Sequence, residues 1–309
     1  LYLKFAHDLP DDEVRERGLE SPYMQYFTGD VYFQYELPYD PSSLTRWRNR
    51  LDEAGAEELL AQTIDAAKSL KVIRPRELQV VTIDTTMQEK NIAHPADSRL
   101  LDVSRAKLAE QAAEAGIKLR QSYARVGPRL SHQAGRYTHA RQPYEFGVKA
   151  SSAIATNKGV IVGARSFPSN PCDGNTLAEQ LEQTAILTDT PVETALVDLG
   201  YRGREMDGVR VLHRGKPKRM SRAEERLLKR RQAVEPNIGH LKADHRLRRN
   251  FLKGVRGAAM NPILAAAGFN LRWLMRWIVL FWHWLWAAVM GLVDQTNINR
   301  RPALASAAA

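Results

Sequence analysis

The residues from Leu78 to Ile83 place the strongest constraint on the fold. They read LQVVTI, a run rich in β-branched and apolar side chains that is bounded by charged residues. This pattern predicts a buried strand that ends at Asp84. A second apolar stretch, ETALVDLGYRG at 193–203, predicts another strand, which ends at Asp198. Two buried strands so far apart in the chain require a sheet built from distant segments.

The intervening sequence indicates how that sheet is completed. YEFGVKASSAIAT (144–156) and GVIVGARSFPS (159–169) have strand patterns and are separated by the turn NKG, which predicts an antiparallel hairpin. Helical spacing of apolar residues predicts a long helix over 98–125 and another after PCDGNT, through LAEQLEQTAILT. This order of strands and helices is typical of an α/β fold with mixed strand directions.

Residues 40–70 predict a pair of helices. Ser42 or Ser43 serves as the expected N-cap, Gly55 as the expected break, and the second helix runs to about Leu70. Two short helices around a glycine turn resemble a helix-turn-helix, which binds DNA. The alternative is an ordinary helical pair whose arginines face water.

The positive charge of the chain is concentrated in one segment. The formal net charge is +10, and residues 214–256 alone contain fifteen Lys or Arg against four acids, so the remainder is close to neutral. A cationic face of this kind indicates a polyphosphate partner, because neutralising phosphates releases their counterions. A solvated helix face is the alternative. The single cysteine, Cys172, excludes an intrachain disulfide and a thiolate zinc cluster.

Three carboxylates stand out by their positions. Asp84 and Asp198 lie where predicted strands end, which is the edge where ligands of α/β sheets gather. Glu235 lies in the helical, basic segment that follows. Carboxylates from three elements can hold two Mg²⁺ ions for phosphodiester cleavage. Capping or solvated carboxylates are the competing interpretation.

Pro236 complicates the placement of Glu235. On one continuous helix, Arg231, Glu235 and Lys242 would share a face. Proline lacks an N–H and disfavours helical geometry at the preceding residue. We therefore predict a helix break within a residue or two of Glu235, with its side chain still turned toward Asp84 and Asp198.

Several long motifs, in order, resemble one family. They are VVTIDTTMQEKNIAHPADSRL, YEFGVKAS, VGARSFPSNPCDGNTLAEQLEQ, ALVDLGYRG and RRQAVEPNIGHLKADHRLRRNFLKG. This sequence resembles the Asp-Asp-Glu (DDE) transposases of bacterial insertion sequences, in particular the insertion-sequence-five family. The N-terminal SPYMQYFTGDVYFQYELPYDPSSLTRWRNRL is similar to the helical N-terminal region of that family, and the resemblance covers most of residues 2–275.

The resemblance implies a ribonuclease H-like mixed sheet flanked by helices, with a helical N-terminal region and a helical C-terminal tail. It implies Asp84, Asp198 and Glu235 as catalytic ligands of two Mg²⁺ ions, or of Mn²⁺ in their place. The family pattern Tyr, two residues, Arg, three residues, Glu, six residues, Lys fits here except that Leu228 takes the tyrosine position. The expected DNA contacts are Arg231, Lys242, Tyr201, Arg202, Lys149, His240, Arg46, Trp47 and Arg50.

The function expected from the resemblance is DNA transposition. The chain would bind terminal inverted repeats, cut DNA with Mg²⁺, and join the 3′ ends to target DNA, as a cytoplasmic, DNA-bound homodimer. Residues 1–75 would form a truncated DNA-binding region, 76–260 the catalytic domain with a helical insert at 98–142, and 261–309 the tail. The family's basic stretch between RYTHARQ and PYEFG is missing at Gln142 and Pro143. The alternative is therefore an inactive copy that only binds DNA.

The C-terminal segment is unusually apolar. Residues 273–286 contain five of the six tryptophans, and Trp277 to Val293 forms an apolar run of seventeen residues. At about 1.5 Å per residue such a helix is slightly shorter than a bilayer core. We expect it to pack on the core or on a second protomer rather than to anchor the chain in a membrane, and we expect residues 300–309 to be disordered.

Overall fold

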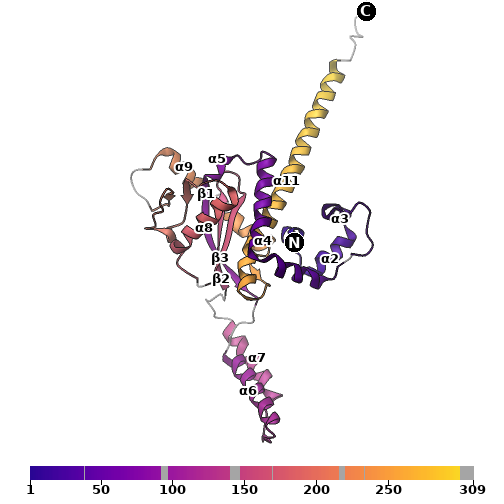
Figure 1. Cartoon of the computed structure of the whole chain (residues 1–309), viewed down its shortest axis with the longest axis vertical. Helices are drawn as coiled ribbons and strands as arrows, with labels where there is room; N and C mark the ends of the chain where they lie inside the picture. The colour runs from indigo at the N-terminus through magenta and orange to yellow at the C-terminus, as the bar shows by residue number, and fades with distance from the viewer. Residues whose placement is uncertain are drawn as a thin grey trace, which may run out of the picture. The chain divides into compact units, whose positions relative to one another are not determined.

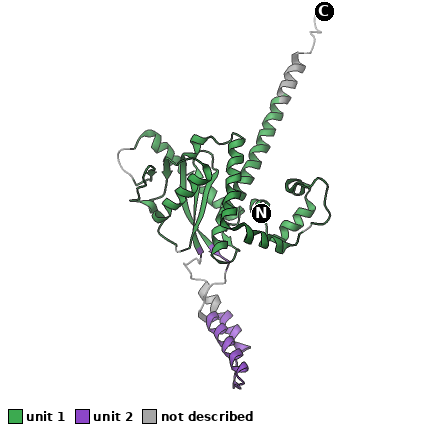
Figure 2. Cartoon of the chain, viewed as in Figure 1, with its two compact units in different colours: residues 1–88, 148–309 green, residues 89–147 purple. Residues whose placement is uncertain are grey.

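The computed structural model describes residues 1–37, 39–91, 97–139, 147–168, 170–215, 220–232 and 234–299. The chain divides into two compact units, residues 1–88 with 148–309, and residues 89–147 (Figure 2). The expected boundaries near 75 and 260 both fall inside the first unit. The expected deletion at Gln142 and Pro143 and the tail at 300–309 lie outside the described residues.

The first unit is built on a mixed sheet (Figure 1). Its strand order is β3-β2-β1-β4-β5, and β6 pairs with β1. Strands β2 and β3 are antiparallel, whereas β4 runs parallel to both β1 and β5. The predicted hairpin and the mixed strand directions are therefore confirmed. The strands are β1 (Val80–Lys90), β2 (Gly147–Ala155), β3 (Ile161–Phe167), β4 (Thr194–Leu196), β5 (Arg210–Leu212) and β6 (Arg249–Asn250).

Helices flank this sheet. Helices α8, α4 and α11 pack on β3, and α9 packs on β4. The helices of the first unit are α1 (Tyr2–Ala6), α2 (Asp11–Glu20), α3 (Pro22–Thr28), α4 (Pro41–Ser69), α5 (Pro75–Leu78), α8 (Asp173–Thr188), the short 3₁₀ helix η1 (Leu199–Tyr201), α9 (Arg222–Arg231), α10 (Glu235–Asp244) and α11 (Gly254–Asn299).

A buried asparagine joins three of these elements. The Asn270 side chain on α11 is 0% exposed. Its Oδ1 accepts the N–H of Ile161 at 2.9 Å, and its Nδ2 donates to the carbonyl of Ile161 at 2.8 Å and to Thr63 Oγ1 on α4 at 3.0 Å. These bonds satisfy the outer backbone groups at the start of edge strand β3. The asparagine thereby fixes α11 and α4 to the sheet.

The N-terminal helix α1 is held against α11 and α10. A Cβ atom added at Gly268 would lie 2.6 Å from the backbone carbon of Phe5, so only glycine permits this approach of α1 to α11. The Nδ1 atom of His245 lies 2.8 Å from the Phe5 carbonyl oxygen. Burial lowers the pKa of His245 to about 4, so near neutral pH the ring is uncharged and its N–H donates to this carbonyl.

Helix α4 consists of two helical parts joined by a kink, as predicted, but its N-cap and the position of the break differ from the prediction. Its N-cap is Asp40, whose side chain accepts the N–H of Ser42, rather than Ser42 or Ser43. The kink lies at Asp52, with φ 61° and ψ −171°, whereas Gly55 lies within the second part of the helix. Both predictions were wrong because Asp40 and Asp52 can bond backbone N–H groups with their own side chains, Asp52 to the N–H of Glu53.

The second unit contains α6 (Asp97–Glu114) and α7 (Val126–His139), which pack together. The predicted single helix over 98–125 is wrong beyond Glu114. Gly116 adopts φ +73°, and the N–H of Ile117 donates to the carbonyl of Ala112, which ends the helix in a left-handed glycine cap. The helical insert was expected at about 98–142, and these two helices begin at Asp97 and end at His139.

Helix α11 changes its environment along its length. Residues up to Leu274 are largely buried against α4, α1 and β3. Beyond that point the expected packing on the core is absent, because Trp282, Trp284 and Trp286 are each more than 60% exposed. By length and composition Gly254–Ala288 could cross a membrane, yet half of its apolar window is buried in the protein.

We predict that Asn270→Ala destabilises the protein strongly. The substitution leaves the N–H and carbonyl of Ile161 buried without partners, and each such group costs about 1–3 kcal/mol. The free energy of unfolding, measured by denaturant titration, should fall by roughly 2–5 kcal/mol. Asn49→Ala, at an exposed position of α4, is the control and should change it by no more than about 0.5 kcal/mol. Equal effects of the two substitutions would contradict the role given to Asn270.

We also predict an acid sensitivity that arises from His245. Its pKa is about 4 in the folded protein and about 6.5 when unfolded, so protonation favours the unfolded state. Above pH 6.5 the histidine is neutral in both states and does not lower the free energy of unfolding. As the pH falls from 6.5 toward 4, protonation of the unfolded state lowers that free energy. His245→Gln keeps an N–H donor without a titrating ring, so its unfolding free energy should fall less steeply over that window. His283→Gln, at an exposed position of α11, is the control and should retain the wild-type slope.

Candidate active site

The pairing of β1 with β4 brings two of the three predicted carboxylates together. Val80 is paired with Thr194 and Thr82 with Leu196 in parallel register. Asp84 and Asp198 each lie two residues beyond the Thr82–Leu196 pair. Because side chains alternate across a strand, this spacing directs both carboxylates toward the face on which Leu196 lies. Asp198 then serves as the N-cap residue of η1.

Helix α9 covers the same face. Its Leu228 is 7% exposed and packs with Leu196 of β4 and Leu212 of β5. Leu228, which stands where the family pattern has tyrosine, is thus a core residue here. Arg231 follows three residues later and shares that face of the helix. Its guanidinium is consequently carried to the end of β4, beside the two aspartates.

The predicted helix break brings Glu235 to the same place. Helix α9 ends at Arg231, and α10 begins at Glu235 with Pro236 in its first turn. Val234, between the helices, is 3% exposed and belongs to the main hydrophobic core. The break that Pro236 indicated is therefore present. It leaves Glu235 at the N-terminus of α10, where the helix dipole favours a negative charge.

All three carboxylates meet at Arg231. Its Nη2 lies 3.6 Å from Asp84 Oδ2, and its Nη1 lies 3.6 Å from Asp198 Oδ1 and 3.8 Å from Glu235 Oε1. These distances are those of ion pairs and are longer than direct hydrogen bonds. The prediction that Glu235 turns toward both aspartates agrees with this geometry.

The cluster is open on one side and buried on the other. The side chain of Arg231 is 6% exposed and that of Asp84 is 24% exposed, whereas those of Asp198 and Glu235 are 57% and 59% exposed. Burial raises the pKa of Asp84, and the charges of Asp198 and Glu235 raise it further, although Arg231 and the N–H of Thr85 oppose them. Three acids thus share one cation, and a negative excess faces solvent.

This donor set suits a hard divalent cation. Mg²⁺ and Mn²⁺ prefer carboxylate oxygens, and the excess of two negative charges calls for further positive charge. Among the residues that the structure describes, no three Asp, Glu, His or Cys side chains close around a single point as metal ligands. In this cluster the guanidinium of Arg231 forms an ion pair with each of the three acids. The chemistry of the donors fits such ions, provided that the side chains regroup.

Three predicted DNA contacts are packed or ion-paired within the protein. The guanidinium of Arg231 is buried among the acids, and Tyr201 is 1% exposed, with burial raising its pKa to about 12. Lys149 Nζ donates to Asp173 Oδ1 at 2.7 Å and to the Pro171 carbonyl at 2.6 Å. Packing and ion pairs inside the protein engage these side chains, and their contact with DNA stays a prediction.

The other predicted contacts near the carboxylates are accessible. Arg202 is exposed just beyond η1, Lys242 is half-buried on α10, and His240 is exposed, with its Nδ1 3.0 Å from Asp244 Oδ2. Arg202 and Lys242 thus have cationic groups within reach of a phosphate.

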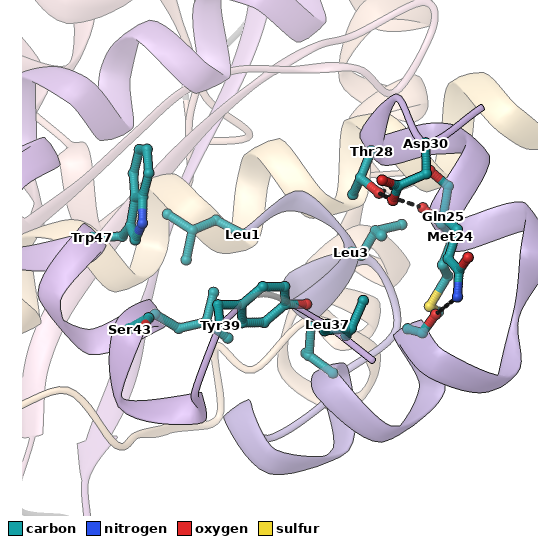
Figure 3. A pocket seen from close by; sticks show the side chains of 13 residues that line it. Leu1, Leu3, Met24, Gln25, Thr28, Asp30, Leu37, Tyr39, Ser43 and Trp47 are labelled. Atoms are coloured by element: carbon teal, nitrogen blue, oxygen red, sulfur yellow. Dashed lines mark hydrogen bonds between the residues drawn. The ribbon is translucent and has the colours of Figure 1, made fainter. Parts of the chain in front are cut away.

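The predicted contacts on α4 are exposed as well. Arg46 and Arg50 face solvent, whereas Arg48 between them is buried and makes two hydrogen bonds to Asp11. Trp47 lines an apolar cavity of about 570 Å³ with Leu1 and Tyr39, as Figure 3 shows. This cavity includes none of the three clustered carboxylates among its lining residues.

Sequence reasoning did not single out Asp173 and Thr85. Thr85 Oγ1 donates to Asp173 Oδ1 at 2.8 Å, directly after Asp84 in β1. Burial would raise the pKa of Asp173, but the hydrogen bonds from Lys149 and Thr85 lower it below its usual value. The segment PCDGNT was interpreted only as the approach to a helix, although α8 begins at Asp173. In the sequence, the one sign that Asp173 has a role was its acidic side chain two residues after Pro171.

Comparisons with known proteins find two similarities to this chain. Residues 208–275 match the family model of the transposase DDE domain, a span that contains Arg231 and Glu235. The "uncharacterized protein ORF8 in nfe locus" of Rhizobium meliloti is 49% identical over 141 residues, which cover 46% of this chain and 68% of that relative. No solved structure matches the chain. The chain therefore belongs to one family with the ORF8 protein, and its residues 208–275 are similar to a transposase DDE domain.

Proposed function

We propose that this protein is a transposase that binds the terminal inverted repeats of an insertion sequence, cleaves the DNA with Mg²⁺, and joins the 3′ ends to target DNA. The observation that carries the proposal is the convergence of Asp84, Asp198 and Glu235 on one guanidinium. The ordered motifs of the sequence support membership in the insertion-sequence-five family. The mixed sheet, with one antiparallel and one parallel half, is compatible with a ribonuclease H-like fold.

The three carboxylates are the proposed ligands of two Mg²⁺ ions, which Mn²⁺ can replace. When bound, such ions activate a water or a 3′ hydroxyl and stabilise the leaving oxygen. Asp84 is fixed within β1, so it is the most rigid of the three. Asp198 precedes η1 and Glu235 begins α10, so both side chains extend from element ends toward solvent. This arrangement leaves the open side of the cluster for a phosphodiester.

Exposed cations around the cluster are the proposed DNA surface. Arg202 follows Asp198, and Lys242 lies two turns after Glu235 on α10. The outer face of α9 adds Arg226, Lys229 and Arg230, which are all exposed. These side chains offer phosphate contacts whose affinity should depend steeply on salt. Arg46, Trp47 and Arg50 on α4 remain the proposed contacts with the inverted repeats.

We further propose that the protein acts as a homodimer on DNA, in the cytoplasm of a bacterial cell. An insertion sequence has two ends, and one active site for each end allows both to be processed together. The exposed tryptophans of α11 do not enter this proposal.

Asp198→Asn should abolish cleavage while leaving DNA binding intact. The amide is a poorer ligand than a carboxylate, and the loss of transition-state stabilisation by several kcal/mol lowers the rate by roughly a hundredfold or more. Nicking and strand transfer are measured on labelled DNA carrying the element's ends, with Mg²⁺ and with Mn²⁺. Asp207→Asn is the matched control, because Asp207 is exposed on the nearby loop, and it should keep wild-type activity.

The same assay distinguishes an active transposase from the alternative, an inactive copy that only binds DNA. Undiminished product from Asp198→Asn would exclude this residue as a metal ligand. If the wild-type protein binds the DNA with a steep salt dependence yet nicks it with neither Mg²⁺ nor Mn²⁺, the chain is a DNA-binding copy without catalytic activity.

A further inference from the structure

Arg231 occupies a position that its neighbouring basic residues do not share. Arg230 and Lys229 on the same helix are exposed, whereas the side chain of Arg231 is 6% exposed and directed at three acids. A buried charge is costly unless it is paired, and here the pairing groups are the proposed metal ligands. The guanidinium therefore lies among the oxygen atoms that divalent ions would take.

The contacts of Arg231 are numerous but loose. None of its three ion pairs is shorter than 3.6 Å, and its buried Nε has no hydrogen-bond partner within the described parts of the chain. An arginine that is built in permanently usually makes short, paired hydrogen bonds to a carboxylate, as Arg48 does with Asp11 at 2.8 and 2.6 Å. By this comparison Arg231 offsets part of the negative charge of the cluster without fixing the acids in place.

The pair of Lys149 and Asp173 provides a second contrast. There one ammonium meets one carboxylate at 2.7 Å, and Thr85 and the Pro171 carbonyl complete the hydrogen bonds. Asp173 is therefore neutralised by Lys149 and fixed by its hydrogen bonds. In the cluster of Arg231, one positive charge faces three negative ones, so two acids in excess remain to attract cations.

We propose that Arg231 is an internal counter-cation that holds Asp84, Asp198 and Glu235 together before divalent ions bind and then competes with those ions for the same oxygens. This inference rests on the proposed function, because it takes the three acids as metal ligands. A single guanidinium can reduce the repulsion among three carboxylates but cannot cancel it. Divalent ions supply more charge at shorter distance, so they displace the guanidinium from the oxygens, and its positive charge weakens their binding.

The test measures metal binding rather than activity. Mn²⁺ and Mg²⁺ are titrated by calorimetry into the full chain, as the wild type and as Arg231→Met, which removes the charge but retains an unbranched apolar stem. We expect the Kd of Arg231→Met to be at least roughly tenfold lower than that of the wild type. Its melting temperature without metal should be lower, and saturating metal should raise it by more than in the wild type. Arg230→Met is the matched control, because it removes an exposed charge one position away and should leave the Kd within about twofold.

The outcomes distinguish the inference from the proposed function. Equal or weaker metal binding by Arg231→Met, with a folded protein, would overturn the role of Arg231 while leaving the metal site in place. No binding of either ion by the wild type or the variant would remove the metal site itself, and with it the proposed function.

A measurement on the wild type covers the case in which Arg231→Met does not fold. The ¹⁵N resonance of Arg231 Nε, assigned from its loss in Arg231→Lys or by through-bond correlation to the backbone, is followed as Mg²⁺ is added. We expect it to change as the guanidinium leaves the carboxylates, while the resonance of Arg230 stays in place. An unchanged Arg231 resonance at saturating Mg²⁺ would refute the competition.

Discussion

The parallel pairing of β1 with β4 is the constraint on which the candidate site depends. It sets Thr82 opposite Leu196, and the two residues that follow on each strand place Asp84 and Asp198 on one face. Leu196 also receives Leu228 from α9, so the same stretch of β4 that aligns the aspartates anchors the helix that carries Arg231. A shift of this register by one residue would place the two aspartates on opposite faces of the sheet, so that only one of them could contact Arg231.

The rest of the first unit stabilises that register from a distance. Asn270 fixes α11 to β3 and α4, while Gly268 and His245 hold α1 against α11 and α10. None of these residues contacts the carboxylates in the bonds described above. They make the sheet and its helices one packed body, so that three acids from three elements can be held near one another despite their repulsion. Of the three acids, only Glu235 comes from the strongly cationic segment 214–256.

Much of the site could be predicted from local sequence patterns. The apolar run before Asp198 shows where β4 ends, and Pro236 shows where a helix breaks. The β-branched run before Asp84 marks the buried part of β1, but the prediction that this strand ends at Asp84 was wrong, because β1 continues to Lys90. What the patterns could not show is which charges pair. Arg231 and Arg230 look alike in the sequence, yet one is buried among acids and the other is exposed. Lys149 was predicted to contact DNA because the sequence around it does not show that Asp173 is its ion-pair partner. The kink of α4 likewise lies at Asp52, whose side chain bonds a backbone N–H, and not at Gly55.

The central claim is that Asp84, Asp198 and Glu235 together hold divalent ions. The most direct measurement is anomalous diffraction from crystals of the full chain soaked in Mn²⁺. The account predicts two Mn²⁺ peaks about 4 Å apart, coordinated by oxygen atoms of these three side chains, with the guanidinium of Arg231 withdrawn from them. Crystals at saturating Mn²⁺ in which the ions bind elsewhere, or in which the three carboxylates still surround Arg231, would contradict it.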